Sequence, residues 1–186
     1  MRRLDRTTAL LAVIDVQEKF AKVIHGFDDV QRNIDRLIRG CHILGVPAAV
    51  TEQYTRGLGE TVDALKKAIA DTYGAAAKPM EKMCFSSQGC AEFADALTRA
   101  KRKQILLAGI EAHVCVWQTC IDLLDAGYEV YVVADAVSSR SAENRDIALR
   151  RMEQEGAKLT STEMALFEMT VQSGTDEFKT ISKLVK

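Results

Sequence analysis

Apolar residues along the chain gather into short runs that alternate with amphipathic segments. Three strong runs span Thr8 to Val16, Gln104 to Ile110 and Glu129 to Val137, and weaker ones span Val46 to Thr51 and Lys158 to Thr162. A run without regular polar positions is typical of a strand buried on both faces, as in parallel sheets. These runs therefore predict the strands of a buried, parallel sheet.

The segments between the runs show helical spacing. Between Asp29 and Leu44, apolar residues recur three and four positions apart, and Gly45 follows where a helix commonly ends. The stretch around Lys82 to Ser87 shows weak periodicity and is expected to be irregular. The same reasoning predicts further helices over Thr61 to Ala70, Ala91 to Lys101, Val114 to Ala126 and Ser141 to Gln154.

Strands that alternate with helices of about 10 to 15 residues favour an α/β fold with a doubly wound parallel sheet. The sequence contains no internal repeat, low-complexity tract or Pro/Gly-rich linker that would mark a boundary. We therefore expect one domain over residues 1–186.

Composition narrows the function classes. The chain has 25 basic and 26 acidic residues, a net charge of -1 and no basic run, so a small-molecule ligand is expected rather than nucleic acid. The apolar run Ala9 to Ile14 is far shorter than the roughly 20 residues of a membrane helix, and no cleavage site follows it. Five cysteines without a C-x-x-C pair favour free thiols, so we predict a cytoplasmic protein without a membrane partner.

Candidate chemistry lies just after the strands, because ligands of open α/β sheets bind beyond the strands' carboxyl ends. Cys115 falls between a strand and an apolar helix, where backbone N–H groups favour a thiolate and can hold an oxyanion. Between valines, it also fits a buried apolar position. Asp15 ends an apolar strand, where burial favours proton transfer, although a helix cap fits equally. Lys82 alone is typical of a surface charge.

Other catalytic templates find no match. The motifs G-x-G-x-x-G, G-x-x-x-x-G-K-[ST] and G-x-S-x-G are absent. His25, His42 and His113 lie in separate segments without the spacing of a zinc site. A pair of Cys115 with His113 is conceivable, but residues two apart at a helix start do not face each other well. No cofactor is expected.

Three short motifs, in order, resemble those of the isochorismatase-like cysteine hydrolases. They are Asp15 at the end of the first strand, Lys82 in the pattern K-x-x-F-S, and G-x-x-x-x-x-C-V from Gly109 to Val116. The resemblance covers nearly the whole chain and implies a three-layer fold with a six-stranded parallel sheet. Further segments are similar to the subgroup of isochorismatase domain-containing proteins: Gln17 to Phe20, Thr51 to Tyr54, Gly57 to Gly59, Gly109 to Ala112, Ser138 to Ser141 and Phe178 to Lys186.

The resemblance implies a catalytic triad of Asp15, Lys82 and Cys115. In such a site Asp15 is the base, Lys82 favours the thiolate, and Cys115 attacks a small amide or related carbonyl compound to give a thioester. The family pattern also implies a cis peptide bond between Ile110 and Glu111, and an oxyanion hole formed by the N–H groups of Glu111 and Cys115. Assembly as a homo-oligomer is expected from the same resemblance.

Two departures from the family pattern limit the activity. The segment Thr51 to Arg56 lacks the histidine of the nicotinamidase metal cluster, so no catalytic metal and no nicotinamidase activity are predicted. Isochorismatases that cleave a vinyl ether lack the cysteine, so that activity is not predicted either. A catalytically weak ligand-binding or scaffold protein is the alternative to an enzyme. The candidates for the substrate pocket are Gln17, Phe20, Gln53, Tyr54, Phe85 and Trp117, of which the apolar Phe20, Phe85 and Trp117 fit core or subunit interface equally well.

Overall fold

A six-stranded parallel sheet forms the centre of the protein. The computed structural model describes residues 3–74 and 77–186, and it places the strands in the order β3-β2-β1-β4-β5-β6. All five neighbouring pairs are parallel. The predicted α/β fold with six parallel strands is therefore confirmed. The strands are β1 (Ala9–Ile14), β2 (Ala48–Gln53), β3 (Met80–Lys82), β4 (Gln104–Ile110), β5 (Glu129–Ser138) and β6 (Lys158–Thr160).

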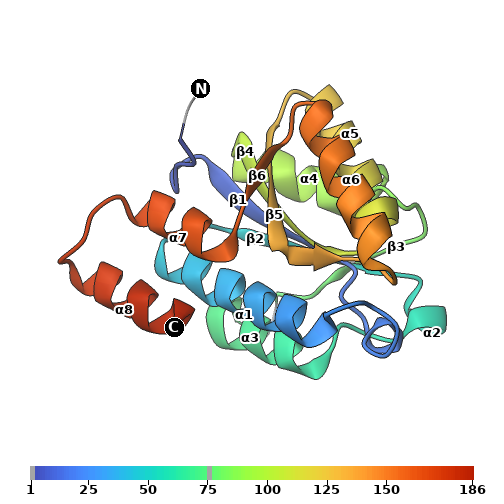
Figure 1. Ribbon diagram of the computed structural model, residues 1–186, viewed down its shortest axis with the longest axis horizontal. Helices are drawn as coiled ribbons and strands as arrows, with labels where there is room; N and C mark the ends of the chain where they lie inside the picture. Colours follow the sequence, from blue (N-terminus) through green and yellow to red (C-terminus); the bar gives the residue numbers. More distant parts are fainter. Residues whose placement is uncertain (1–2, 75–76) are drawn as a thin grey trace.

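Helices cover both faces of the sheet (Figure 1). One face carries α1 (Phe27–Ile43), α3 (Asp63–Tyr73), α7 (Thr162–Thr170) and α8 (Asp176–Val185). The other face carries α4 (Ala91–Ala100), α5 (Trp117–Asp125) and α6 (Ala142–Gln154). Shorter elements are α2 (Thr55–Leu58), two 3-10 turns (Glu18–Phe20 and Ser87–Gly89) and a π-helical turn (Ala112–Val116).

The sheet separates two apolar cores, which explains the continuous apolar runs in the sequence. Along β1, Leu11 and Val13 face the core beneath α1, whereas Leu10 and Ala12 face the core beneath α4 to α6. Every residue of β1 and of β4 is buried. Alternate side chains of a strand point to opposite faces, so two covered faces require apolar residues throughout.

Three elements escape the sequence-based prediction. Strand β3 ends at Lys82, where the stretch expected to be irregular begins, and it has three residues that pair with β2 alone. Such a short edge strand leaves no periodic pattern to recognise. Helix α7 contacts α1, β5 and α8 and buries five of its nine residues, so its apolar residues do not form one stripe. Helix α8 was not predicted either.

The strand order places the carboxyl ends of β1 and β4 at a topological switch point. Strands β2 and β3 extend the sheet to one side of β1, and β4, β5 and β6 extend it to the other. Connections leave β1 and β4 toward opposite faces at this position, which opens a crevice beyond the strand ends. Asp15 follows β1 directly, and Glu111 follows β4 directly.

Gly109 allows β1 and β4 to approach closely just before these ends. It lies opposite Ile14 in the sheet, and its φ is +124°. A Cβ atom built on Gly109 would lie 2.1 Å from the carbonyl oxygen of Ile14. The register between β4 and β5 also shifts between Leu107 and Gly109. Only glycine fits this position, because it lacks Cβ and adopts positive φ readily.

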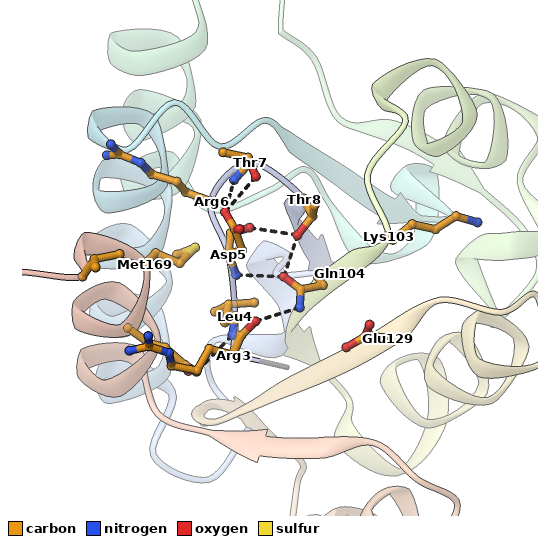
Figure 2. A pocket seen from close by; sticks show the side chains of 12 residues that line it. Arg3, Leu4, Asp5, Arg6, Thr7, Thr8, Lys103, Gln104, Glu129 and Met169 are labelled. Atoms are coloured by element: carbon orange, nitrogen blue, oxygen red, sulfur yellow. Dashed lines mark hydrogen bonds between the residues drawn. The ribbon is translucent and has the colours of Figure 1, made fainter. Parts of the chain in front are cut away.

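A cavity of about 490 Å³ lies at the opposite end of the strands, beside the amino-terminal end of β4 (Figure 2). Gln104 holds the first described residues there: its Oε1 accepts hydrogen bonds from the N–H of Asp5 and the hydroxyl of Thr8, both at 2.8 Å. Its Nε2 donates to the carbonyl of Arg3 at 3.0 Å. The hydrogen-bonding groups of Gln104 are thus occupied by the chain itself.

Among the described residues, no helix is long and apolar enough to cross a membrane.

Candidate active site

Asp15 and Lys82 form a fully enclosed ion pair beyond the end of β1. The Nζ of Lys82 lies 2.7 Å from Oδ2 of Asp15, and neither side chain is exposed. The hydroxyl of Thr51 donates to the other oxygen, Oδ1, at 2.8 Å. The backbone of Asp15 has a φ of 53°, which is uncommon outside glycine. Both carboxylate oxygens therefore have fixed partners.

Lys82 reaches Asp15 from the edge of the sheet across the end of β2. It pairs with Gln53 in the β2–β3 ladder, and its Nζ also binds Oε1 of Gln53 at 2.8 Å. The carbonyl oxygens of Cys84 and Phe85 accept from the same Nζ at 3.1 and 3.0 Å. These acceptors hold the ammonium group in one place, as burial of a charge requires.

Cys115 lies in the π-helical turn that joins β4 to α5, and its thiol is close enough to the carboxylate of Asp15 for each group to shift the pKa of the other. Only 7% of its surface is exposed. The structure thus brings together Asp15, Lys82 and Cys115. The first and the last of these three are 100 positions apart in the sequence. His113 has a different partner from Cys115, as its sequence position suggests: its Nδ1 lies 2.9 Å from the hydroxyl of Ser139.

Burial sets the protonation of the site. Burial and the negative charge of Asp15 raise the pKa of Cys115 to about 12, although Lys82 acts against this rise. Burial also raises the pKa of Asp15, against the opposing effects of the Lys82 charge and of hydrogen bonds from Lys82, Thr51 and Cys115. Desolvation thus opposes the preference for a thiolate that is expected at the helix start, and the ionisation of Cys115 in the free protein stays a prediction.

Glu111 opens the turn that carries Cys115. The peptide bond between Ile110 and Glu111 is cis. The carbonyl oxygen of Glu111 accepts from the N–H groups of Val114 and Val116, at 3.0 and 3.2 Å. In the part of the chain that the structure describes, the N–H of Glu111 donates to no other group.

Two predicted pocket residues, Gln17 and Gln53, form a hydrogen-bond network that supports the site. The Nε2 of Gln17 donates to the carbonyls of Gln53 and Gly59 at 2.9 and 2.6 Å, and its Oε1 accepts from the N–H of Gln53 at 2.7 Å. The amide of Gln17 is unexposed and all these bonds are made to the backbone, so its contact with substrate stays a prediction. Gln53 binds Lys82 with Oε1 and the carbonyl of Met83 with Nε2, so it positions the lysine.

The four aromatic candidates divide into two groups. Tyr54 and Phe85 flank the Lys82 network and are 44% and 53% exposed. Phe20 packs against the core beneath α1, and Trp117 packs against the opposite core, with the guanidinium of Arg151 4.0 Å from its ring centre. Tyr54 and Phe85 are therefore the aromatic side chains at the surface beside the site.

Sequence reasoning missed Thr51 and the side chain of Glu111. Thr51 lies within β2, whereas the rule for open α/β sheets selects residues that follow strands.

Within the described ranges, no group of three or more histidine, cysteine, aspartate or glutamate side chains could hold a metal ion. The absence of a metal from the functional protein stays a prediction. All five cysteines are free thiols.

Comparison with known proteins identifies the family of the chain. The family described as the isochorismatase domain matches residues 8–164. The chain belongs to the isochorismatase family. It is 44% identical to the secreted isochorismatase effector Isc1 of Phytophthora sojae, over 99% of this chain and 87% of that protein. It is 40% identical to isochorismatase domain-containing protein 2 of Danio rerio, over 98% and 89%.

A solved structure titled MAR1 ribonuclease, from Caenorhabditis elegans, has the same fold. The TM-score is 0.90 at 42% identity, and the match covers 99% of this chain and 92% of that one. The resemblance to the isochorismatase domain-containing subgroup is confirmed, and family membership supports a hydrolase of a small substrate. One relative of this isochorismatase-family protein is named as secreted, so the cytoplasmic location stays a prediction.

Lys82→Met is expected to destabilise this family member by about 3 to 5 kcal/mol at neutral pH, because it leaves Asp15 buried without its cation. Without Lys82, the pKa of Asp15 rises further above its ordinary value of 3.8. A raised folded-state pKa means that stability falls as pH increases from the unfolded value to the folded one. Urea unfolding should therefore show a smaller loss at pH 5 than at pH 8.

The double variant Asp15→Asn/Lys82→Met provides the control for this change. It removes both charges, so most of the lost stability should return, and the pH dependence should disappear. An equal loss in the single and double variants would show that the bonds of the ammonium to Gln53, Cys84 and Phe85, rather than the ion pair, stabilise the site.

Proposed function

We propose that this protein is a cysteine hydrolase that cleaves a small amide or related carbonyl compound through a thioester. The observation that carries the proposal is the position of Asp15, whose carboxylate pairs with the ammonium of Lys82 and interacts with the thiol of Cys115. A nucleophile within hydrogen-bond reach of a base, with that base oriented by a third group, is the arrangement of covalent catalysis.

In the first step, the sulfur of Cys115 attacks the substrate carbonyl carbon as its proton passes to Asp15. The new carbon–sulfur bond forms at the expense of the carbonyl π bond, whose electron pair moves to the oxygen. The tetrahedral intermediate then collapses: the carbon–oxygen double bond re-forms, the carbon–nitrogen bond breaks, and the amine leaves with the proton from Asp15. The product of this step is a thioester on Cys115.

Water completes the reaction. Asp15, again ionised, accepts a proton from water as the water oxygen attacks the thioester carbon. Collapse of this second intermediate breaks the carbon–sulfur bond, releases the carboxylic acid, and returns the proton to the sulfur. Lys82 stays protonated throughout and favours the ionised sulfur whenever Asp15 holds the proton.

The oxyanion of both intermediates needs hydrogen-bond donors. The N–H of Glu111 is suited to this role because it lies at the start of the turn that holds Cys115 and donates to no described group. The N–H of Cys115 is the second donor in this proposal. Preorganised donors of this kind commonly contribute about 100-fold to 1,000-fold each to turnover.

The enclosed charges do not favour phosphate binding, although one structural relative is titled a ribonuclease. Lys82 is the cation of the site, and its charge is already paired with Asp15 and unexposed. The whole chain carries a net charge of -1, whereas nucleic-acid binding relies on cationic surfaces. We therefore propose a small-molecule substrate rather than RNA.

A ligand-binding or scaffold protein is the second candidate function. It is favoured by Cys115, which is 7% exposed and whose thiol has a pKa raised to about 12. Turnover of any amide or ester that depends on Cys115 would exclude it. We also propose that the protein assembles as a homo-oligomer, because apolar side chains such as Met83, Phe85 and Val171 are more than half exposed. Light scattering, which gives the molar mass in solution, tests this assembly.

Alkylation with iodoacetamide tests the proposed nucleophile. If Asp15 takes the thiol proton within the site, mass spectrometry should locate the adduct on Cys115 at a rate that varies less than about threefold from pH 6 to 8. A thiol that titrates independently with a pKa of about 12 would instead react about tenfold faster per pH unit. That slope, or an adduct on other cysteines alone, would contradict the proposal.

A further inference from the structure

The side chain of Glu111 is buried and bound by one residue. Its Oε1 accepts two hydrogen bonds from Arg140, one from the backbone N–H and one from Nε, both at 3.0 Å. The Glu111 side chain is 8% exposed, whereas that of Arg140 is 64% exposed. A surface arginine therefore clamps a buried carboxylate from outside.

The clamped residue also controls the geometry of the nucleophile. The carbonyl of Glu111 accepts from Val114 and Val116, which flank Cys115 on both sides. Its N–H is the proposed oxyanion donor. Glu111 thus connects the surface clamp to both groups that must meet the substrate carbonyl.

The loop that carries Arg140 is fixed to the same turn at two further points. Ser138, the last residue of β5, is in register with Ile110, and the hydroxyl of Ser139 lies 2.9 Å from Nδ1 of His113. Three consecutive residues, Ser138 to Arg140, therefore contact the segment that leads to Cys115. The loop is a rigid support for the Arg140 clamp.

We propose that Glu111 and Arg140 are positioning residues, which together aim the backbone N–H of Glu111 at the oxyanion; this inference rests on the proposed function. Two donors on one carboxylate oxygen restrict rotation of the Glu111 side chain and, through it, of the adjoining peptide. A carboxylate that loses these donors while buried turns toward water, because an unpaired buried charge is costly. Displacement of a catalytic donor by about 1 Å lowers rates about 100-fold.

The experiment compares two reactions of the same thiol. Acylation by p-nitrophenyl acetate passes through an oxyanion, whereas alkylation by iodoacetamide displaces iodide and forms none. In Arg140→Met and in Glu111→Gln, we expect the acylation rate of Cys115 to fall about 10-fold to 100-fold while the alkylation rate stays within about threefold of the wild-type rate. Arg140→Lys keeps the charge and the backbone donor but loses Nε, so it should lie between wild type and Arg140→Met.

The control is Arg150→Met, which removes an exposed arginine from α6 and should change neither rate. Equal losses of acylation and alkylation in Arg140→Met and Glu111→Gln would overturn the inference, because they would indicate general distortion of the turn. Unchanged acylation in both variants would also overturn it. Failure of the wild-type protein to be acylated on Cys115 would instead refute the proposed function, and the inference with it.

Discussion

Cys115→Ala is expected to lower the turnover of an amide or ester substrate by at least about 1,000-fold while the protein keeps its fold. In the proposed mechanism the thiol supplies the atom that bonds to the substrate, and alanine offers none. The change removes one sulfur atom from the core beneath α4 to α6, which costs about 1 kcal/mol of stability. Turnover should be measured on protein whose circular dichroism and melting temperature match the folded state.

Cys120→Ala is the matched control for this change. Cys120 lies in α5, is unexposed, and belongs to the same core as Cys115. It loses the same atom, so a packing effect on activity would appear in both variants. Full activity in Cys120→Ala with none in Cys115→Ala would assign the loss to chemistry. Comparable activity in Cys115→Ala and wild type would mean that another group attacks the substrate.

Gly109→Ala is expected to cost more than about 4 kcal/mol of stability, or to prevent folding altogether. The added Cβ would lie 2.1 Å from the carbonyl oxygen of Ile14 and 2.6 Å from its nitrogen, and both are backbone atoms of a buried strand. No rotation of a side chain relieves such a contact. Urea unfolding or, for an insoluble variant, the yield of folded protein measures the effect.

Gly45→Ala separates the steric overlap from the effect of positive φ. Gly45 has a φ of +70° and no atom within 4 Å of the added Cβ, so its substitution should cost about 1 to 2 kcal/mol. The difference between the two variants reports the contact with Ile14. If Gly109→Ala were no less stable than Gly45→Ala, the two strands would be able to separate at little cost.

Most of the fold could be predicted from the sequence because burial leaves a pattern. Strand β4 matches its predicted range, Gln104 to Ile110, since two covered faces demand a continuous apolar run. Strand β3 was missed because it has three residues on the sheet edge. Its place in the sheet is fixed by contacts with β2, and such contacts leave no local signal.

The site was less predictable because side-chain directions are set by tertiary contacts. Asp15 and Cys115 follow strands, so the rule for open α/β sheets selects them. Lys82 extends across a neighbouring strand, and only family resemblance selected it. Gln17 lies beside Asp15 in sequence, yet its amide binds the backbone around Gly59.

The enclosure of Asp15, Lys82 and Cys115 has a further consequence for the energy of the reaction. In the proposed reaction the thiol proton moves to Asp15, so one negative charge disappears from oxygen and one appears on the sulfur of the neighbouring Cys115, under the influence of the same ammonium. The cluster as a whole neither gains nor loses charge. Burial of a newly created ion costs much free energy, but this transfer creates no additional ion. Its desolvation cost is therefore small, and water need not enter the site to solvate a new charge.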